Sequence, residues 1–558
     1  MFNKNLECIK DVVLKTRLSR ISIKESSKDM SYCLTPTRDY LLMKNEVPID
    51  DINDPRQAVK DALKSSIKAK MEAKDIIITF GIGLGYLLDE TFNTYPSKIF
   101  VYEPDIELLH FVLNNVDISE HLSSGRVFLV TELDDLIKQI DSTFISKDKV
   151  EIVYLKNYAV VKNQELLQMT QKVYETCRSK MIDINTITRF SKIWLINTLT
   201  NISTINQQRV FCLSDLEGKF AGQTALILAS GPSLNENIEK IKADRNKYVI
   251  FAVNKVLRTL ERAGIIPDFA VCLDANHIEP TFTGLDSFLS QINCIFNLKS
   301  DNVIPNINFK KLFVSFSEND AIVKNLSRFN SFIKEYESGG SAATFAMVSA
   351  IKMGFAKIIF CGLDLAFKDN LMYSDGEMTS RVSENEIQFY SDKKALVKVK
   401  SVTGTEVETR EDYAATIHHF EQLINNLNYS EIYNTTSFGA LIEGMKNSKL
   451  EDIPAAVPAV GMDFLLQNLN KINFEIKDWT QEELFLINNV ISALSKGNFS
   501  PALVSSIVKS PLLYQYMQAQ VLKVLQTQFS PESAEDFLNK TKLAIREVVD
   551  LLQKNSLI

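Results

Sequence analysis

The chain has 558 residues, enough for roughly three or four domains, and its 45% apolar and 23% charged residues are typical of a globular protein. Its net charge of −7 argues against a dedicated nucleic-acid-binding protein, which would carry a basic excess. The seven cysteines have no CxxC spacing, which argues against a zinc site and against a disulfide framework. No apolar run reaches the roughly 18 residues that span a bilayer, and the opening MFNKNLECIKDVVLK lacks the apolar core of a secretory signal. We therefore expect a cytoplasmic protein without membrane insertion.

The first 155 residues combine a short β-meander with alternating strands and helices. The segment SYCLTPTRDYLLMKN predicts the meander, and four later apolar runs, DIIITF, KIFVYEP, RVFLV and VEIVYL, predict strands separated by helical patterns. Strands that alternate with helices form parallel sheets through right-handed crossovers. Residues 160–215 have a charged helical pattern typical of a connector, so a smaller α/β N-terminal domain with its connector is predicted over residues 1–215.

Glycines follow the first of these strands in FGIGLGYLLDE, at Gly81, Gly83 and Gly85. Glu103 ends the next strand, about 20 residues later, where a ribose-binding carboxylate lies in dinucleotide-binding and S-adenosylmethionine-binding folds. The spacing is GxGxG, however, and no catalytic residues follow it. Two interpretations stay open: a nucleotide or cofactor site, or glycines that only permit a close turn from strand to helix.

A second and larger alternation covers about residues 222–440. Its predicted strands are TALILA, YVIFAV, FAVCLD, NCIFNL, KLFVSF, KIIFCG and EIYNTT, which indicates a Rossmann-like α/β domain over residues 216–455. Strand signals then stop, and an α-helical domain is predicted over residues 456–558. In this domain Thr480 and Glu483 are expected to form a capping box, and Ser530-Pro531-Glu532 is expected to begin another helix.

Small and polar residues follow the central strands at their carboxyl ends, where open α/β sheets bind ligands. The run ALILASGPSL places a turn between a strand and a helix, so backbone N–H groups, hydroxyls and a helix N-terminus meet at one point. The run ESGGSAATF places a similar turn before a later helix and predicts a second anion-binding site. The candidate ligand-binding residues are Ser230, Gly231, Pro232, Ser233, Asn254, Lys255, Asp274, Asn276, Ser338, Gly339 and Gly340.

Five motifs in order, GPSL, AVNKVL, PDFAVCLDAN, SGGSAATFAMVSAIKMG and GLDLAF, resemble one family. With YNTTSFGALIEGM and the FGIGLGYLLDE…IFVYEPD segment, they are similar to the motility-associated factors (Maf), bacterial flagellin glycosyltransferases with a 6-hydroxymethylpterin pyrophosphokinase-like (DUF115) central domain. That domain is in turn similar to bacterial sialyltransferases of the Campylobacter type, whose GNGPSL turn has an asparagine where this chain has Ser230. The resemblance covers about residues 40–450.

The resemblance implies a glycosyltransferase that moves a nonulosonic acid, such as pseudaminic or legionaminic acid, from a CMP-activated donor to Ser or Thr of flagellin, in support of motility. It also implies a reaction that requires no metal and no further cofactor. The sialyltransferases use a histidine after the aspartate strand, but LAFKDNLMYSDGEMTS contains none, so the candidate catalytic residues are Asp364, Tyr373 and Asp375. Asp364 or Asp375 would accept the proton, and Tyr373 would stabilise the leaving phosphate.

Two other functions stay open at this point. One is an ATP-dependent pyrophosphokinase acting on a pterin, which would need Mg²⁺ held by carboxylates such as Asp274 and Asp364. The other is a non-catalytic flagellin-binding chaperone with a degenerate nucleotide-sugar fold, which fits the absent histidine and Ser230. The sequence also leaves open which nonulosonic acid is used and whether the chain forms a homo-oligomer.

Overall fold

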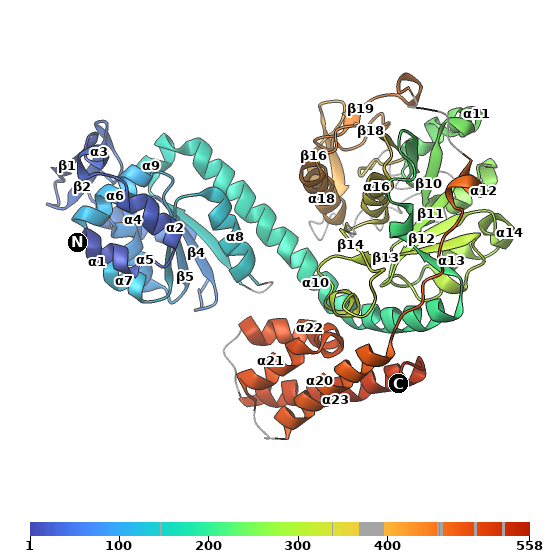
Figure 1. The fold of residues 1–558 in the computed structure, drawn as a ribbon. Coiled ribbons are helices and arrows are strands. Elements are labelled where there is room, and N and C mark those ends of the chain that lie inside the picture. The colour runs from blue at the N-terminus through green and yellow to red at the C-terminus, as the bar shows by residue number, and fades with distance from the viewer. Residues whose placement is uncertain are drawn as a thin grey trace. The chain divides into compact units, whose positions relative to one another are not determined.

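The computed structural model describes residues 1–145, 148–337, 339–367, 396–454, 457, 461–495, 499–526 and 531–558. The chain divides into two compact units, one built mainly from Met1–Thr186 and one built mainly from Ile187–Leu522 (Figure 1). The long helix α10 (Asn163–Gln207) contributes residues to both units. Within the described residues, no helix is both long enough and apolar enough to cross a membrane.

The first unit contains a parallel sheet with the strand order β6-β5-β4-β7. Its strands are β4 (Ile76–Phe80), β5 (Lys98–Tyr102), β6 (Val127–Val130) and β7 (Val150–Tyr154), and a separate antiparallel meander has β1 (Met30–Leu34), β2 (Tyr40–Lys44) and β3 (Val47–Pro48). Its helices are α1 (Phe2–Cys8), α2 (Val12–Ser19), α3 (Ile23–Ser26), α4 (Pro55–Ser66), α5 (Tyr86–Thr94), α6 (Ile106–Asn115), α7 (Ser119–Ser123), α8 (Leu133–Thr143) and α9 (Lys156–Val161). The predicted meander and the four predicted strands are confirmed.

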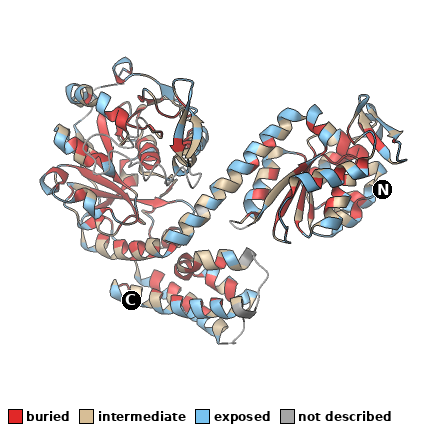
Figure 2. Ribbon diagram, turned by 180° about the vertical axis from the view of Figure 1, so that it is seen from behind, coloured by how far each residue is buried: buried red, intermediate tan, exposed pale blue. Residues whose placement is uncertain are grey.

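The second unit contains a larger sheet with the order β14-β13-β12-β11-β10-β9-β15-β18-β19, and β8 also pairs with β13. Its ladders are parallel, and its inner strands are buried along their length (Figure 2). Burial on both faces is characteristic of parallel sheets covered by helices. The strands are β8 (Val210–Cys212), β9 (Thr224–Leu228), β10 (Val249–Val253), β11 (Phe269–Cys272), β12 (Asn293–Asn297), β13 (Lys311–Ser317), β14 (Glu335–Tyr336), β15 (Lys357–Cys361), β18 (Ile432–Asn434) and β19 (Lys446–Asn447).

Short helices and one hairpin connect these strands. The helices are η1 (Leu213–Leu216), η2 (Pro232–Glu236), α11 (Ile238–Ala243), η3 (Arg245–Lys247), η4 (Asn254–Val256), α12 (Leu257–Ala263), α13 (Glu279–Phe282), α14 (Asp286–Leu289), η5 (Ile304–Asn306), α15 (Ala321–Leu326), α16 (Ala342–Met353), α18 (Glu411–Leu427) and η6 (Leu450–Asp452). The hairpin consists of β16 (Leu396–Lys400) and β17 (Glu406–Arg410). The C-terminal region is helical, as predicted, with α19 (Met462–Leu465), α20 (Lys477–Leu494), α21 (Pro501–Lys509), α22 (Pro511–Gln526) and α23 (Pro531–Lys554).

Two local predictions differ from the structure. The predicted helical connector ends before β8, which joins the central sheet beside β13. The capping box predicted at Thr480 is wrong, because α20 already begins at Lys477 and the Thr480 hydroxyl donates to the Lys477 carbonyl at 3.0 Å. Its predicted partner, Glu483, is buried and instead accepts from the Ser510 hydroxyl at 3.0 Å.

Candidate functional site

The order of strands in the central sheet reverses between β9 and β15. From β9 the chain passes to β10 and onward to β14 on one side, whereas β15 pairs with the opposite side of β9. Ligands of open parallel sheets bind outside the carboxyl ends of the strands at such a reversal. The turn of residues 230–234 follows β9, and Asp364 follows β15, so two sequence-predicted features meet at this point.

The turn after β9 is held by hydrogen bonds from its own backbone. Gly231 N donates to Gly362 O at 2.8 Å, Ser233 N to Asp364 Oδ2 at 2.9 Å, and Leu234 N to Gly231 O at 3.1 Å. The chain then enters the 3₁₀ helix η2 at Pro232 instead of the α-helix expected there. The N–H groups of Gly231, Ser233 and Leu234, which were expected to bind an anion, are thus used within the protein. Ser230, at the start of the turn, is half-buried.

Asp364 connects the reversal point to the loop that follows β18. It is 2% exposed, and its Oδ1 accepts from the Thr436 hydroxyl at 2.5 Å while Oδ2 accepts from Ser233 N. Burial raises the pKa of Asp364, and the hydrogen bonds from Ser233 and Thr436 oppose that rise. Glycine is required at position 231, because a Cβ there would lie 2.5 Å from Asp364 Oδ2. The carboxylate therefore positions the turn, and its predicted role as proton acceptor stays a prediction.

Asn254 and Asp274 lie at the ends of the neighbouring strands β10 and β11 and bond to each other. Asn254 is 3% exposed, and its Nδ2 donates to Asp274 Oδ2 at 3.0 Å. This bond fixes the orientation of the amide, whose oxygen Oδ1 is the atom that can accept from a ligand. Lys255 follows within η4 and is exposed, and Asn276 is half-buried two residues after Asp274.

The N-terminus of α16 supplies the second predicted turn. Ser341 caps the helix through a reciprocal pair, in which Thr344 N donates to Ser341 Oγ at 3.2 Å and Ser341 N donates to Thr344 Oγ1 at 2.9 Å. Gly339 has a φ of +65°, and Gly340 has open space around its Cα. Because α16 crosses from β14 back to β15, its N-terminus lies at the carboxyl edge of the sheet, where its first N–H groups favour an anion. Ser338 lies outside the described residues.

The sequence reasoning missed the elements that surround Asp364. Thr409 of β17 donates from its hydroxyl to Leu365 O at 2.6 Å, and Phe367 N donates to Glu408 O at 3.2 Å, so the hairpin lies against the exit of β15. Leu365 has a φ of +46°, which is rare for a branched side chain and occurs at functional sites. The alternating run LVKVKSVTGTEVETR, with Gly404 at its turn, is the signal that predicts such a hairpin. Tyr373 and Asp375 lie outside the described residues.

The glycine-rich turn of the first unit is closed by a side chain of the same chain. Tyr158 of α9 lies against Gly81, where a Cβ would be 2.5 Å from the Tyr158 ring. Its hydroxyl donates to Glu103, which is fully buried and also accepts from two backbone N–H groups at 3.0 Å. Burial raises the pKa of Glu103 to about 7. The structure therefore favours the interpretation in which these glycines permit a close turn.

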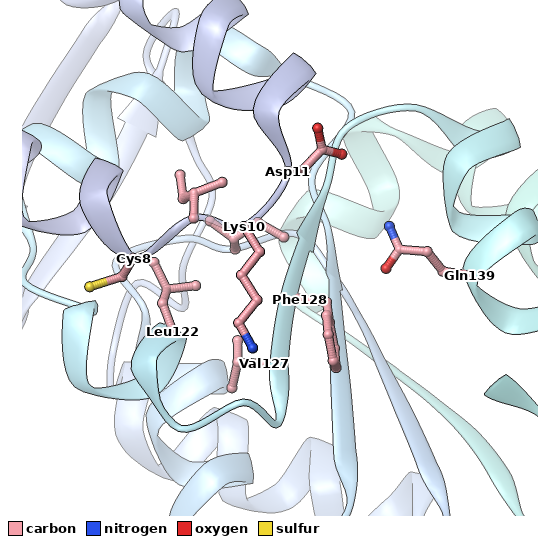
Figure 3. A pocket seen from close by; sticks show the side chains of 9 residues that line it. Cys8, Lys10, Asp11, Leu122, Val127, Phe128 and Gln139 are labelled. Atoms are coloured by element: carbon pink, nitrogen blue, oxygen red, sulfur yellow. The ribbon is translucent and has the colours of Figure 1, made fainter. Parts of the chain in front are cut away.

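A hollow of about 280 Å³ lies elsewhere in the first unit, beside β6. Figure 3 shows side chains from the link between α1 and α2, from β6 and from α8 lining it. Lys10 and Asp11 are its charged residues, and it contains none of the residues predicted from the sequence. The carboxyl edge of the central sheet is therefore the better candidate.

Comparisons with known proteins match the part of the chain that contains the central sheet. Residues 196–370 match the family model described as 6-hydroxymethylpterin diphosphokinase MptE-like. A protein of Treponema pallidum (strain Nichols), described as an uncharacterized protein, is 28% identical over 123 residues, which are 22% of this chain and 55% of that relative. The chain thus spans about half the length of this curated relative.

A solved structure, the MAf glycosyltransferase from Magnetospirillum magneticum AMB-1, is similar over 100% of this chain and 96% of that one, with a TM-score of 0.65 and 14% identity. The expected fold is confirmed: a Rossmann-like central domain, a smaller α/β N-terminal domain and a helical C-terminal region. The resemblance to the motility-associated factors is likewise confirmed at the level of the MptE-like domain and the fold.

Proposed function

We propose that the chain is a glycosyltransferase that transfers a nonulosonic acid of the pseudaminic or legionaminic type from a CMP-activated donor to Ser or Thr hydroxyls of flagellin. The observation that carries this proposal is the similarity of the whole chain to a glycosyltransferase fold, combined with four strand-end motifs at one edge of the central sheet. We place the reaction in the cytoplasm, before flagellin is exported for assembly and motility.

Breaking a CMP–sugar bond develops charge on the departing phosphate, so the site must stabilise that charge more than the ground state. The N-terminus of α16 offers N–H groups and a favourable dipole beside Gly339 and Gly340, and Ser230 offers a hydroxyl. Asn254 presents its Oδ1 to a donor such as the cytosine amino group or a ribose hydroxyl. Asp364 or Asp375 would accept the proton, and Tyr373 would stabilise the leaving phosphate.

A comparison of Asn254→Ala with Asn426→Ala tests this proposal. Asn426 is an exposed residue of α18 and serves as the matched amide control. Each variant is co-expressed with flagellin and the nonulosonic acid pathway, and the intact mass of flagellin is measured. We expect Asn254→Ala to remove most of the added mass, to keep its binding to flagellin, and to lose stabilisation by CMP, while Asn426→Ala behaves like the parent. A strain that lacks this protein gives the decisive outcome.

Flagellin of the same mass in that strain and in the wild type would disprove the proposal. If Asn254→Ala loses its binding to flagellin while the mass of flagellin does not change, the result would favour the non-catalytic chaperone.

The matched family description favours a second candidate, an ATP-dependent pterin pyrophosphokinase. That reaction would need Mg²⁺, with Asp274 and Asp364 as its candidate ligands. Both Asp364 oxygens already accept hydrogen bonds, and among the described residues no three His, Cys, Asp or Glu side chains cluster as a metal site would require. Thermal unfolding distinguishes the two functions: CMP should raise the melting temperature under the transferase proposal, and ATP with Mg²⁺ should do so under the kinase alternative.

A further inference from the structure

A second hollow, of about 450 Å³, lies at the amino-terminal edge of the central sheet. It is lined by residues 208, 209 and 211, at the start of β8, and by residues 305–312, at the start of β13. These two strands are parallel neighbours, so both enter the sheet at this edge. The hollow therefore lies at the opposite edge from the candidate donor site and does not belong to it.

The lining of this hollow is cationic. Arg209, Lys310 and Lys311 line it, and no carboxylate does among the residues that the structure describes. Lys310 pairs with the exposed Asp463 at 2.8 Å, and the charge of Lys311 also acts on that carboxylate, although Arg209 and Lys311 form no ion pair within 4 Å with any residue that the structure describes. Three cations without a lining carboxylate attract anions to this edge, although the chain as a whole has a net charge of −7.

The two unpaired cations are held by an aromatic ring. The Arg209 guanidinium lies 5.5 Å and the Lys311 ammonium 5.9 Å from the centre of the Phe211 ring. Such cation–π contacts restrict long side chains without neutralising their charge. Gln208 Nε2 also donates to Asn306 Oδ1 at 2.9 Å, which joins the two walls of the hollow. Less side-chain freedom is consequently lost when an anion binds.

The rest of the lining favours a peptide over a free phosphate. Phosphate sites commonly use glycine-rich turns or helix N-termini whose N–H groups converge, and this lining contains no glycine. Its floor is apolar, with Phe211, Phe309 and Pro305, and exposed amides of Asn306 and Asn308 lie at its rim. We propose that this hollow binds an acidic peptide segment that carries an apolar side chain, supplied by a partner protein. The proposal does not rest on glycosyl transfer.

Fluorescence anisotropy of the full-length protein tests the proposal. The probe is a fluorescein-labelled peptide, Asp-Glu-Phe-Glu-Asp, and its matched control is Asn-Gln-Phe-Gln-Asn. We expect saturable binding of the acidic peptide that weakens as salt is raised, and at least a tenfold weaker affinity in the Arg209→Ala/Lys311→Ala variant. The charge-matched variant Lys324→Ala/Lys449→Ala removes two exposed lysines that do not line the hollow and should bind like the parent.

Binding of the neutral peptide and of pyrophosphate, measured beside the acidic peptide, identifies the class of ligand. Equal binding of the acidic and neutral peptides, or equal affinity in the two double variants, would overturn the proposal. Pyrophosphate that binds through Arg209 and Lys311 while the peptide does not would also overturn it, because the site would then take a small anion. Circular dichroism shows whether both double variants are folded. Arg209→Lys keeps the positive charge, so it should retain most of the affinity for the peptide.

Discussion

Asp364 accepts hydrogen bonds from Ser233 and Thr436, which lie 131 and 72 positions away in the chain. Its carboxylate could therefore position these segments, accept a proton during the reaction, or do both, and two substitutions distinguish these roles. Asparagine can accept from Ser233 N and donate to Thr436 Oγ1, so Asp364→Asn should keep the turn in place. Alanine leaves the Ser233 N–H and the Thr436 hydroxyl without their acceptor and should lower the free energy of unfolding by roughly 2–4 kcal/mol. Urea unfolding measures this difference.

Transfer activity of the same two variants distinguishes the roles. If Asp364 only positions the turn, Asp364→Asn should stay active and Asp364→Ala should lose activity together with stability. If Asp364 accepts the proton, Asp364→Asn should be stable but inactive, because an amide does not accept the proton. The pH profile adds a second measurement, since the rate of a chain that uses this carboxylate as a base should fall as the pH drops below its raised pKa.

Glu483 should make the stability of the helical region depend on pH. Burial raises its pKa to about 7, against an ordinary value of 4.5, while the Ser510 hydroxyl opposes the shift. Between these values the folded state holds more of this proton than the unfolded state, so the contribution of Glu483 to stability is greatest below pH 4.5 and is lost as the pH rises through 7. The difference is about 3 kcal/mol for a fully buried group.

Glu483→Gln should abolish that pH dependence, because glutamine has a similar shape and no titrating proton. The chain has two tryptophans, and Trp479 is buried one helical turn before Glu483. In a Trp194→Phe background, Trp479 fluorescence reports urea unfolding of this region at pH 5 and pH 8. An equal change in the free energy of unfolding between pH 5 and pH 8 in the parent and in Glu483→Gln would contradict the raised pKa of Glu483.

At the scale of the element, the glycine-rich turn of the first unit is explained by packing, and two of its glycines provide a matched test. Both Gly81 and Gly85 have positive φ, but a Cβ at Gly81 would lie 2.5 Å from the Tyr158 ring, whereas the nearest atom at Gly85 would be 3.6 Å away. Gly85→Ala should cost about 1 kcal/mol of backbone strain, and Gly81→Ala at least about 2 kcal/mol. Hydrogen exchange of peptides that cover β4 and β5 measures the loss of stability in each variant. Equal protection in Gly81→Ala and Gly85→Ala would contradict the explanation that Gly81 is required by its packing against Tyr158.

Elements were predictable where the pattern was long and local. The seven central strands are apolar runs bounded by turn residues, and all were found. β8 was missed because three residues, Val210–Cys212, cannot be distinguished from a helical segment by periodicity. The capping box at Thr480 was wrong because α20 begins three residues earlier, at Lys477, and Glu483 is buried against Ser510, a contact 27 residues away that the local motif does not show. The strand ends of the candidate site were predictable, whereas the bonds of Asp364 to Ser233 and Thr436 join distant segments that no local pattern relates.

At the scale of the whole molecule, the second unit presents two chemically different edges of one sheet. The carboxyl edge has Asn254, the N-terminus of α16 and the exit of β15, and the amino edge has the cationic hollow. Strands buried throughout their length, such as β12, separate these edges. Ligands at the two edges should therefore bind without competing, because neither contacts the residues that hold the other.

Hydrogen exchange with both ligands tests this separation directly. CMP should slow exchange in peptides that cover residues 229–234, 339–344 and 362–367, and the acidic peptide should slow exchange over residues 305–312, since bound groups restrict opening of the amides that they contact. Saturating CMP should change the affinity for the acidic peptide by less than about twofold, which corresponds to a coupling free energy near zero. Protection of residues 305–312 by CMP, or displacement of the peptide by CMP, would show that both ligands use one site and would contradict the assignment of two edges.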